Sequence, residues 1–151
     1  MAAFCYGRSI VFADTDAAGV VYFARFLSLC HEAYEASLQA AGIDLKTFFQ
    51  ASDLAVPIVQ TSADFLAPLT CGDRIEITLT VSLISDTEFR LDYEIWLGQA
   101  PDRPTSANSG TDAIAKPAGR AFTRHVCIDR QSRRRRSLSA DLGRWSDQYK
   151  E

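Results

Sequence analysis

Two carboxylates stand two residues apart near the start of the chain, in the segment Asp14-Thr-Asp16-Ala-Ala-Gly19. A carboxylate can act as a nucleophile or as a general base. The apolar pattern after Gly19 predicts a long helix, and the free N–H groups at a helix start can stabilise an anion. A carboxylate beside that helix start could therefore attack a carbonyl group or activate water, while the helix N–H groups stabilise the developing negative charge.

Each residue of this segment also has a simpler interpretation. Asp16 precedes the predicted helix, where aspartate commonly serves as an N-cap. Gly19 can be an ordinary turn glycine, or it can let the backbone come close to a bound group. Asp14 can be a solvated or loop-capping residue, or it can influence the ionisation of Asp16, and we assign it no chemistry. The residue types alone leave these alternatives open.

Helical periodicity predicts the two elements that follow the segment. Apolar residues recur every three or four positions from 20 to 41, and the polar residues gather on the opposite side. Gly42 follows directly, at a position where helices commonly end in the left-handed conformation. A short second helix is expected over residues 44–52, with Asp44 as its cap.

Strands are predicted before and after these helices, because apolar and polar residues alternate there. A single apolar-faced helix and one sheet bury each other only if the sheet curls around the helix. The expected fold is therefore α+β, a curled antiparallel sheet wrapped around one long central helix. The strands are expected at 5–13, 56–66 with Pro57 at an edge, 75–83, 89–97 and 119–129, the third and fourth forming a hairpin.

The domain is expected to span residues 1–138, followed by a polar C-terminal tail at 139–151 that can include a short helical piece near 138–145. Residues 98–118 hold three prolines and many small polar residues, which predicts a long mobile loop. No secretory signal or membrane-spanning apolar run is found, and the four cysteines are widely separated. We therefore expect a cytoplasmic protein with reduced thiols.

Composition and motifs exclude several function classes. The net charge of −3 and the pI of 5.4 argue against a general nucleic-acid binder. The only two histidines, His31 and His125, form no H-E-x-x-H pattern, so a zinc hydrolase is not expected. We expect His31 at the surface or at an interface and His125 in a structural role. The chain also lacks the G-x-S-x-G elbow of serine hydrolases and the glycine motifs of nucleotide binders.

The motif Asp14-Thr-Asp16-x-x-Gly19-Val-Val-Tyr22-Phe23, with this order of elements, resembles hotdog-fold acyl-CoA thioesterases of the 4-hydroxybenzoyl-CoA thioesterase type. The resemblance covers residues 4–138 and includes the final strand at 119–129. Within that family, the runs at 13–23 and 30–35 are similar to the 1,4-dihydroxy-2-naphthoyl-CoA hydrolases, which serve phylloquinone synthesis in oxygenic phototrophs. The long loop at 98–118 departs from the tight hairpin that the family pattern implies.

The resemblance implies that Asp16 is the catalytic carboxylate, as nucleophile or general base. It implies that the N–H of Phe23 is an oxyanion donor and that Gly19 lies close to the acyl group. Tyr22 and Phe23 could line an aromatic acyl pocket, although aromatic residues at helical spacing are more often part of a core.

The family also implies an aromatic acyl-CoA substrate, no metal and no cofactor beyond the substrate's own CoA, and a homotetramer with sites between subunits. Arg124, Arg130 or the run Arg133–Arg136 could contact the CoA phosphates, since arginine suits phosphate oxygens, but a terminal charge run is usually solvated. Two alternatives remain, a thioesterase for another acyl-CoA or acyl-carrier-protein substrate and a non-catalytic acyl-binding hotdog domain.

Overall fold

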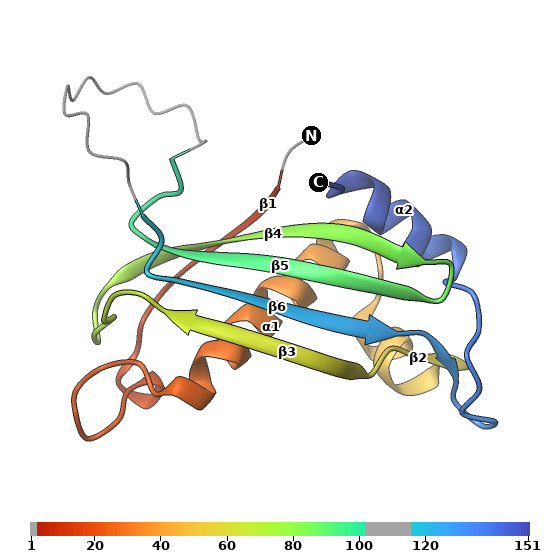
Figure 1. Cartoon of the computed structure of the whole chain (residues 1–151), viewed down its shortest axis with the longest axis horizontal. Helices are drawn as coiled ribbons and strands as arrows, with labels where there is room; N and C mark the ends of the chain where they lie inside the picture. The colour runs from red at the N-terminus through yellow and green to blue at the C-terminus, as the bar shows by residue number, and fades with distance from the viewer. Residues whose placement is uncertain (1–2, 102–115) are drawn as a thin grey trace.

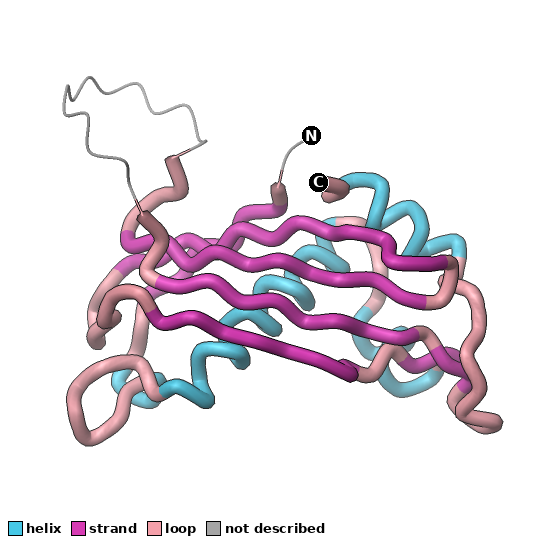
Figure 2. The backbone as a smooth tube through the Cα atoms, in the orientation of Figure 1, coloured by secondary structure: helices cyan, strands magenta, loops and turns pink. Residues whose placement is uncertain are grey.

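Helix α1 (Phe23–Ala40) lies against one face of a five-stranded sheet and crosses the strands obliquely (Figures 1 and 2). The computed structural model describes residues 3–101 and 116–151. The buried positions of α1 recur every three or four residues, as the sequence predicts. The helix begins three residues later than expected. Gly42, just after its end, has a φ of 83°, which confirms the predicted left-handed glycine at the C-terminus. The buried residues are Phe26, Leu29, Cys30, Ala33, Tyr34, Ser37 and Leu38.

The sheet is antiparallel throughout, with the strand order β1-β4-β5-β6-β3. The inward side chains of β4 and β5 alternate with polar ones and pack beneath α1. The predicted α+β hotdog arrangement is therefore confirmed. The strands are β1 (Phe4–Ser9), β3 (Ile58–Phe65), β4 (Arg74–Ser85), β5 (Glu88–Leu97) and β6 (Gly119–Val126), and a small second sheet pairs β2 (Leu54–Ala55) with β7 (Ile128–Asp129).

The predicted strand at 56–66 corresponds to β3, which lies at one edge of the sheet and begins directly after Pro57. The first strand was expected to continue to residue 13, but β1 ends at Ser9, and a 3₁₀ turn, η1, covers Phe12–Asp14. The predicted second helix is a short π-type segment, η2 (Thr47–Ala51). The helical residues Leu45 and Lys46 precede η2, and Asp44 caps their start as expected, because its carboxylate accepts a hydrogen bond of 2.9 Å from the N–H of Thr47.

The C-terminal segment belongs to the folded domain, so the predicted boundary after residue 138 and the predicted polar tail are wrong. Helix α2 (Ala140–Gln148) extends the expected helical piece, and Ser139 caps its start. Its apolar residues Leu142 and Trp145 are fully buried, and the Trp145 indole donates to Ser37 Oγ at 2.9 Å. Two apolar residues three positions apart are enough to dock a short helix whose other residues are mostly polar.

Residues 102–115, which fall within the predicted loop, lie outside the described residues. Elsewhere, in the segments that the structure covers, no helix is long and apolar enough to cross a membrane.

Candidate active site

Residues 14–22 form a narrow hairpin that joins η1 to α1, and we call it the Asp16 hairpin. The N–H of Tyr22 donates to the carbonyl of Asp14, and the N–H of Asp16 donates to the carbonyl of Val20, both at 2.9 Å. Gly19 closes the tip with a φ of 81°, which an L-residue rarely adopts. These hydrogen bonds fix the turn that bears Asp16, and the hairpin leads directly into α1.

Asp16 does not cap α1, so the simpler interpretation of this residue is wrong. The N-cap is Tyr22, six positions later, and its side chain makes no capping hydrogen bond. The exposed Asp16 carboxylate instead accepts a hydrogen bond of 2.9 Å from the N–H of Ala18 in its own turn. The sequence suggested a cap because the helical period extends back to Val20, three residues before the helix begins.

The first turn of α1 presents free N–H groups. Arg25 and Phe26 both donate their N–H groups to the carbonyl of Tyr22, at 2.8 and 3.2 Å. Within residues 3–101 and 116–151, the N–H groups of Phe23 and Ala24 have no acceptor. They are the amides that a helix start leaves for an anionic ligand.

A cavity of about 370 Å³ lies beside these groups. Asp16 and Phe23 both line it, so the structure brings together two of the predicted site residues. Tyr22 and Gly19 are not among the lining residues. Tyr22 packs edge-on against the ring of Phe23, and nothing lies within 4 Å of a Cβ placed on Gly19. Gly19 thus serves the turn conformation of the hairpin in this chain.

Most of the cavity wall comes from residues that the sequence analysis did not assign to the site. These lining residues are apolar, and they come from the hairpin, from α1, from the end of β3 and the segment after it, and from the residue before β6. The backbone holds these parts together, since the N–H of Val21 donates to the carbonyl of Leu69 at 2.8 Å. The additional lining residues are Val20, Val21, Phe26, Phe65, Leu66, Ala67, Pro68, Leu69 and Ala118.

Gly119 on β6 allows Phe26 to occupy its place in this wall. A Cβ at residue 119 would lie 2.4 Å from Cζ of Phe26 and 3.0 Å from the carbonyl oxygen of Asp64. The ring of Phe26 in turn meets that of Phe65 edge-on, with 5.1 Å between centroids. Two aromatic rings therefore shape the cavity because β6 has no side chain at this position.

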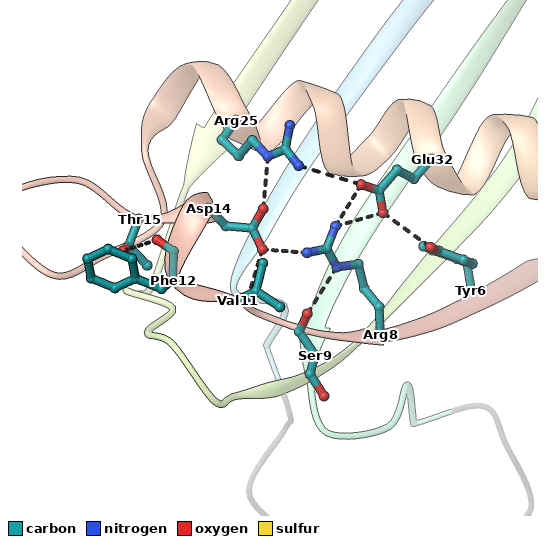
Figure 3. Close-up of polar contacts among 9 residues, drawn as sticks. All are labelled: Tyr6, Arg8, Ser9, Val11, Phe12, Asp14, Thr15, Arg25 and Glu32. Carbon is teal, nitrogen blue, oxygen red and sulfur yellow. Dashed lines mark hydrogen bonds and ion pairs between the residues drawn. The ribbon is translucent and has the colours of Figure 1, made fainter.

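Asp14 is fully buried, so the idea of a solvated residue is wrong, while the loop-capping alternative holds. Its carboxylate accepts a hydrogen bond of 2.9 Å from the N–H of Val11 and ion-pairs with Arg8 and Arg25 (Figure 3). Burial by itself would raise the pKa of Asp14. The hydrogen bonds from Val11 and Arg25 and the charge of Arg8 outweigh that effect and hold the pKa below its ordinary value.

The arginines proposed for the CoA phosphates lie elsewhere. Arg124 forms an ion pair of 2.8 Å with Glu88, near the end of β6 farthest from the cavity residue Ala118. Arg130 donates to the backbone carbonyls of Ser52, Phe49 and Leu54 at 2.9 to 3.1 Å. Within one chain, the structure brings neither arginine to the Asp16 cavity. In the run Arg133–Arg136, Arg135 pairs with Glu88 and Arg136 with Asp129.

The two histidines lie away from the Asp16 cavity. His31 is partly exposed on α1, 3.4 Å from the Glu35 carboxylate. His125 is buried between the carbonyl of Val56 and the hydroxyl of Thr123, and burial lowers its pKa to about 4. No group of three or more possible metal ligands occurs in the described part of the chain.

The fold and the Asp16 hairpin together define a class of protein. Residues 10–146 match the family described as the Thioesterase-like superfamily, and this chain belongs to it. The 1,4-dihydroxy-2-naphthoyl-CoA hydrolase of Crocosphaera subtropica is 52% identical over 140 residues, which cover 93% of each protein. That of Rippkaea orientalis is also 52% identical, over 93% of this chain and 92% of its own length.

The fold agrees with the sequence match. The crystal structure of a 1,4-dihydroxy-2-naphthoyl-CoA thioesterase from Synechocystis aligns with a TM-score of 0.81 and 37% identity, covering 96% of both chains. The resemblance to hotdog thioesterases that the D-T-D motif indicated is thus confirmed, and the narrower similarity extends over nearly the whole chain.

Proposed function

We propose that this chain hydrolyses the thioester of an aromatic acyl-CoA, with 1,4-dihydroxy-2-naphthoyl-CoA as its substrate and 1,4-dihydroxy-2-naphthoate and CoA as products. The observation that carries the proposal is the exposed Asp16 carboxylate at an apolar cavity that the first turn of α1 helps to form. The 52% identity to hydrolases of that name supports the choice of substrate. A role in phylloquinone synthesis follows from this substrate, and that role and a cytoplasmic location are both part of the proposal.

Asp16 supplies the chemistry in one of two ways. As a nucleophile, its carboxylate oxygen bonds to the thioester carbon, the C–S bond breaks, the CoA thiolate leaves, and water then cleaves the resulting anhydride. As a general base, it removes a proton from water while that water attacks the same carbon, after which the C–S bond breaks and the CoA thiolate leaves. In both routes negative charge develops on the carbonyl oxygen, and the free N–H of Phe23 is the proposed donor to it.

The cavity wall supports an aromatic acyl group. Phe23, Phe26 and Phe65 supply aromatic surface, and among the described residues that line the cavity only Asp16 carries a charge. The volume of the cavity, about 370 Å³, lies within the range of small-molecule sites, roughly 300–1,000 Å³. Aromatic rings favour edge-on and offset contacts with one another, which an aromatic acyl group can also make. We propose no metal and no cofactor other than the substrate's CoA, so turnover should survive EDTA treatment.

We propose a homotetramer built from hotdog dimers, in which a neighbouring subunit completes the pocket. β3 is an edge strand, and Ile58, Val59, Phe65 and Leu66 are exposed along it and just beyond its end. An edge strand of this kind favours pairing with another strand. Because Phe65 and Leu66 also line the Asp16 cavity, a subunit paired there would cover the cavity's open side.

Pairing of two β3 strands in antiparallel fashion would also bring distant arginines closer. A second cavity, of about 400 Å³, lies beyond the Ile58 end of β3 and is lined by Pro57, Arg130 and Arg133, among others. In such a dimer, the Ile58 end of one copy approaches the Phe65 end of the other. We therefore retain Arg130, and with less direct support Arg124, as proposed contacts to the CoA phosphates of a site in the neighbouring subunit.

A panel of acyl-CoAs tests the substrate, and Asp16→Asn tests the mechanism. We expect kcat/KM to be highest for 1,4-dihydroxy-2-naphthoyl-CoA, and Asp16→Asn to lose about 10²–10⁴-fold in kcat while CoA binding persists. Equal turnover of short aliphatic thioesters would favour a broader thioesterase. Acyl-CoA binding without any turnover would favour a non-catalytic acyl-binding domain, and undiminished turnover by Asp16→Asn would refute the role of that residue.

A further inference from the structure

A partly buried cluster of charges connects Asp14, the first residue of the Asp16 hairpin, to β1 and α1. It consists of Arg8 from β1, Asp14 from η1, and Arg25 and Glu32 from α1 (Figure 3). Nη1 of Arg8 donates to both carboxylate oxygens of Glu32, at 2.6 and 2.8 Å, and Nη2 of Arg8 donates to Asp14. Tyr6 donates its hydroxyl to Glu32 at 3.1 Å. The two positive and two negative charges balance, so the cluster needs no charge from a ligand.

Asp14 connects the parts of the molecule that carry the proposed chemistry. Its carbonyl accepts the N–H of Tyr22, which is the first hydrogen bond of the Asp16 hairpin. Its carboxylate accepts a hydrogen bond of 2.8 Å from Nε of Arg25, and Arg25 lies in the first turn of α1. One residue therefore fixes both the base of the hairpin that bears Asp16 and the helix turn that bears the Phe23 N–H.

The start of α1 depends on this connection. The N-cap Tyr22 offers no side-chain acceptor to the helix N–H groups, so no local cap fixes the first turn. The Arg25 guanidinium instead connects that turn to a carboxylate that is itself held by the N–H of Val11. A charged hydrogen bond to a fully buried carboxylate allows less variation in geometry than a solvated one.

We propose that Asp14, through Arg25, is a positioning residue that fixes the Asp16 carboxylate relative to the helix N–H groups at the start of α1. The inference rests on the catalytic role proposed for Asp16. Asp14 contacts neither substrate nor reacting atoms in this arrangement. It acts by holding two backbone segments in register, and misplacement of about 1 Å at a reacting centre can cost about 10²-fold in rate.

Asp14→Asn tests this role most directly. The amide keeps the size of the side chain but offers one acceptor oxygen where the carboxylate offers two. We expect kcat to fall about 10²-fold with KM changed by less than about threefold, because the acyl and CoA contacts remain. The matched control is Glu88→Gln, which alters another carboxylate held between two arginines but leaves the Asp16 hairpin untouched. It should keep wild-type kcat, and only kcat is compared, because Glu88 pairs with Arg124, a proposed contact to the CoA phosphates.

Arg25→Gln provides a second variant in case Asp14→Asn does not fold. The Arg25 side chain is 40% exposed, so its replacement leaves the core intact. We expect a loss of about tenfold in kcat at unchanged KM, with partial recovery in Arg25→Lys, which restores the positive charge beside Asp14. A rise in KM at unchanged kcat would instead make Arg25 a substrate contact and overturn the positioning role.

Asp16→Asn, assayed in parallel, separates this inference from the proposed function. If Asp16→Asn is inactive while Asp14→Asn and Arg25→Gln both keep wild-type kcat, the positioning role fails and the proposed function stands. If Asp16→Asn retains full turnover, the proposed mechanism fails first and the positioning role fails with it. Loss of kcat in Asp14→Asn and Arg25→Gln, but not in Glu88→Gln, supports the inference.

Discussion

Two carboxylates in this protein each lie between two arginines, at opposite ends of the sheet. Asp14 lies between Arg8 and Arg25, near the end of the sheet where Ser9 pairs with Arg74. Glu88 lies between Arg124 and Arg135, where the β4–β5 hairpin pairs Ser85 with Glu88. Strand β4 joins the two ends over about 35 Å, at a rise of about 3.3 Å per residue.

The two clusters contain the same kinds of charge, but their surroundings differ. The Asp14 side chain is 0% exposed and also accepts a backbone N–H, whereas that of Glu88 is 10% exposed and its arginines are 40% and 58% exposed. Ion pairs near solvent contribute little to stability, while removal of one partner from a buried pair leaves an uncompensated charge. We therefore expect burial, more than the number of charges, to decide what each cluster contributes.

The largest expected effect is on stability, and it separates the two ends. Asp14→Ala leaves Arg8 and the N–H of Val11 without their buried acceptor, so we expect the free energy of unfolding to fall by about 3–5 kcal/mol. Glu88→Ala should cost about 1–2 kcal/mol, because water can solvate both of its arginines. Urea unfolding at pH 7 measures both changes. Equal losses would show that burial does not distinguish the clusters.

Acid should weaken the Glu88 end before the Asp14 end. His125 pairs with Phe89, next to Glu88, and burial lowers its pKa from 6.5 to about 4. Between those values the unfolded chain binds a proton that the folded chain does not, so stability falls as pH drops from about 6.5 to about 4, by up to about 3 kcal/mol. The pKa of Asp14 is lowered as well, so its contribution persists until the pH falls below about 3.8.

Urea unfolding at pH 7, 5.5 and 4.5 measures this window, and His125→Gln tests its assignment. Glutamine can still hydrogen-bond to the carbonyl of Val56 but does not titrate, so the variant should lose most of the pH dependence between 6.5 and 4. An unchanged slope in His125→Gln would assign the acid sensitivity to another group.

The difference between the two ends also shows which features the sequence could predict. Local periodicity is enough for α1 and for the β4–β5 hairpin, because each buries one regular face. The D-T-D motif made Asp16 the proposed catalytic carboxylate through family resemblance, whereas residue type alone could not separate a helix cap from a catalyst. The burial of Asp14 depends on its ion pairs with Arg8 and Arg25, and no local sequence pattern predicts that those side chains meet.

The cavity wall was unpredictable for a similar reason. Phe65 ends the edge strand β3 and Leu66 follows it, and only the sheet order brings them to the start of α1. One signal was available, since the alternation of the predicted strand gives way to the apolar run Phe65–Leu69 before the turn at Cys71. The burial of α2 was missed because its only buried apolar residues are Leu142 and Trp145, too few to dominate the composition of a nine-residue helix.

The smallest predicted effect again contrasts the two ends, through a glycine at each. At the Asp14 end of the sheet, Gly119→Ala forces a Cβ against the ring of Phe26. We therefore expect a loss of about 1–3 kcal/mol in stability and a raised KM for aromatic acyl-CoA. Near the Glu88 end, Gly143→Ala in α2 meets open space and removes a helix-interior glycine, so it should stabilise the protein by about 0.5–1 kcal/mol. Thermal unfolding and acyl-CoA kinetics measure both variants. A normal KM in Gly119→Ala would show that the position of Phe26 does not shape the acyl site, because the Cβ cannot fit unless that ring moves.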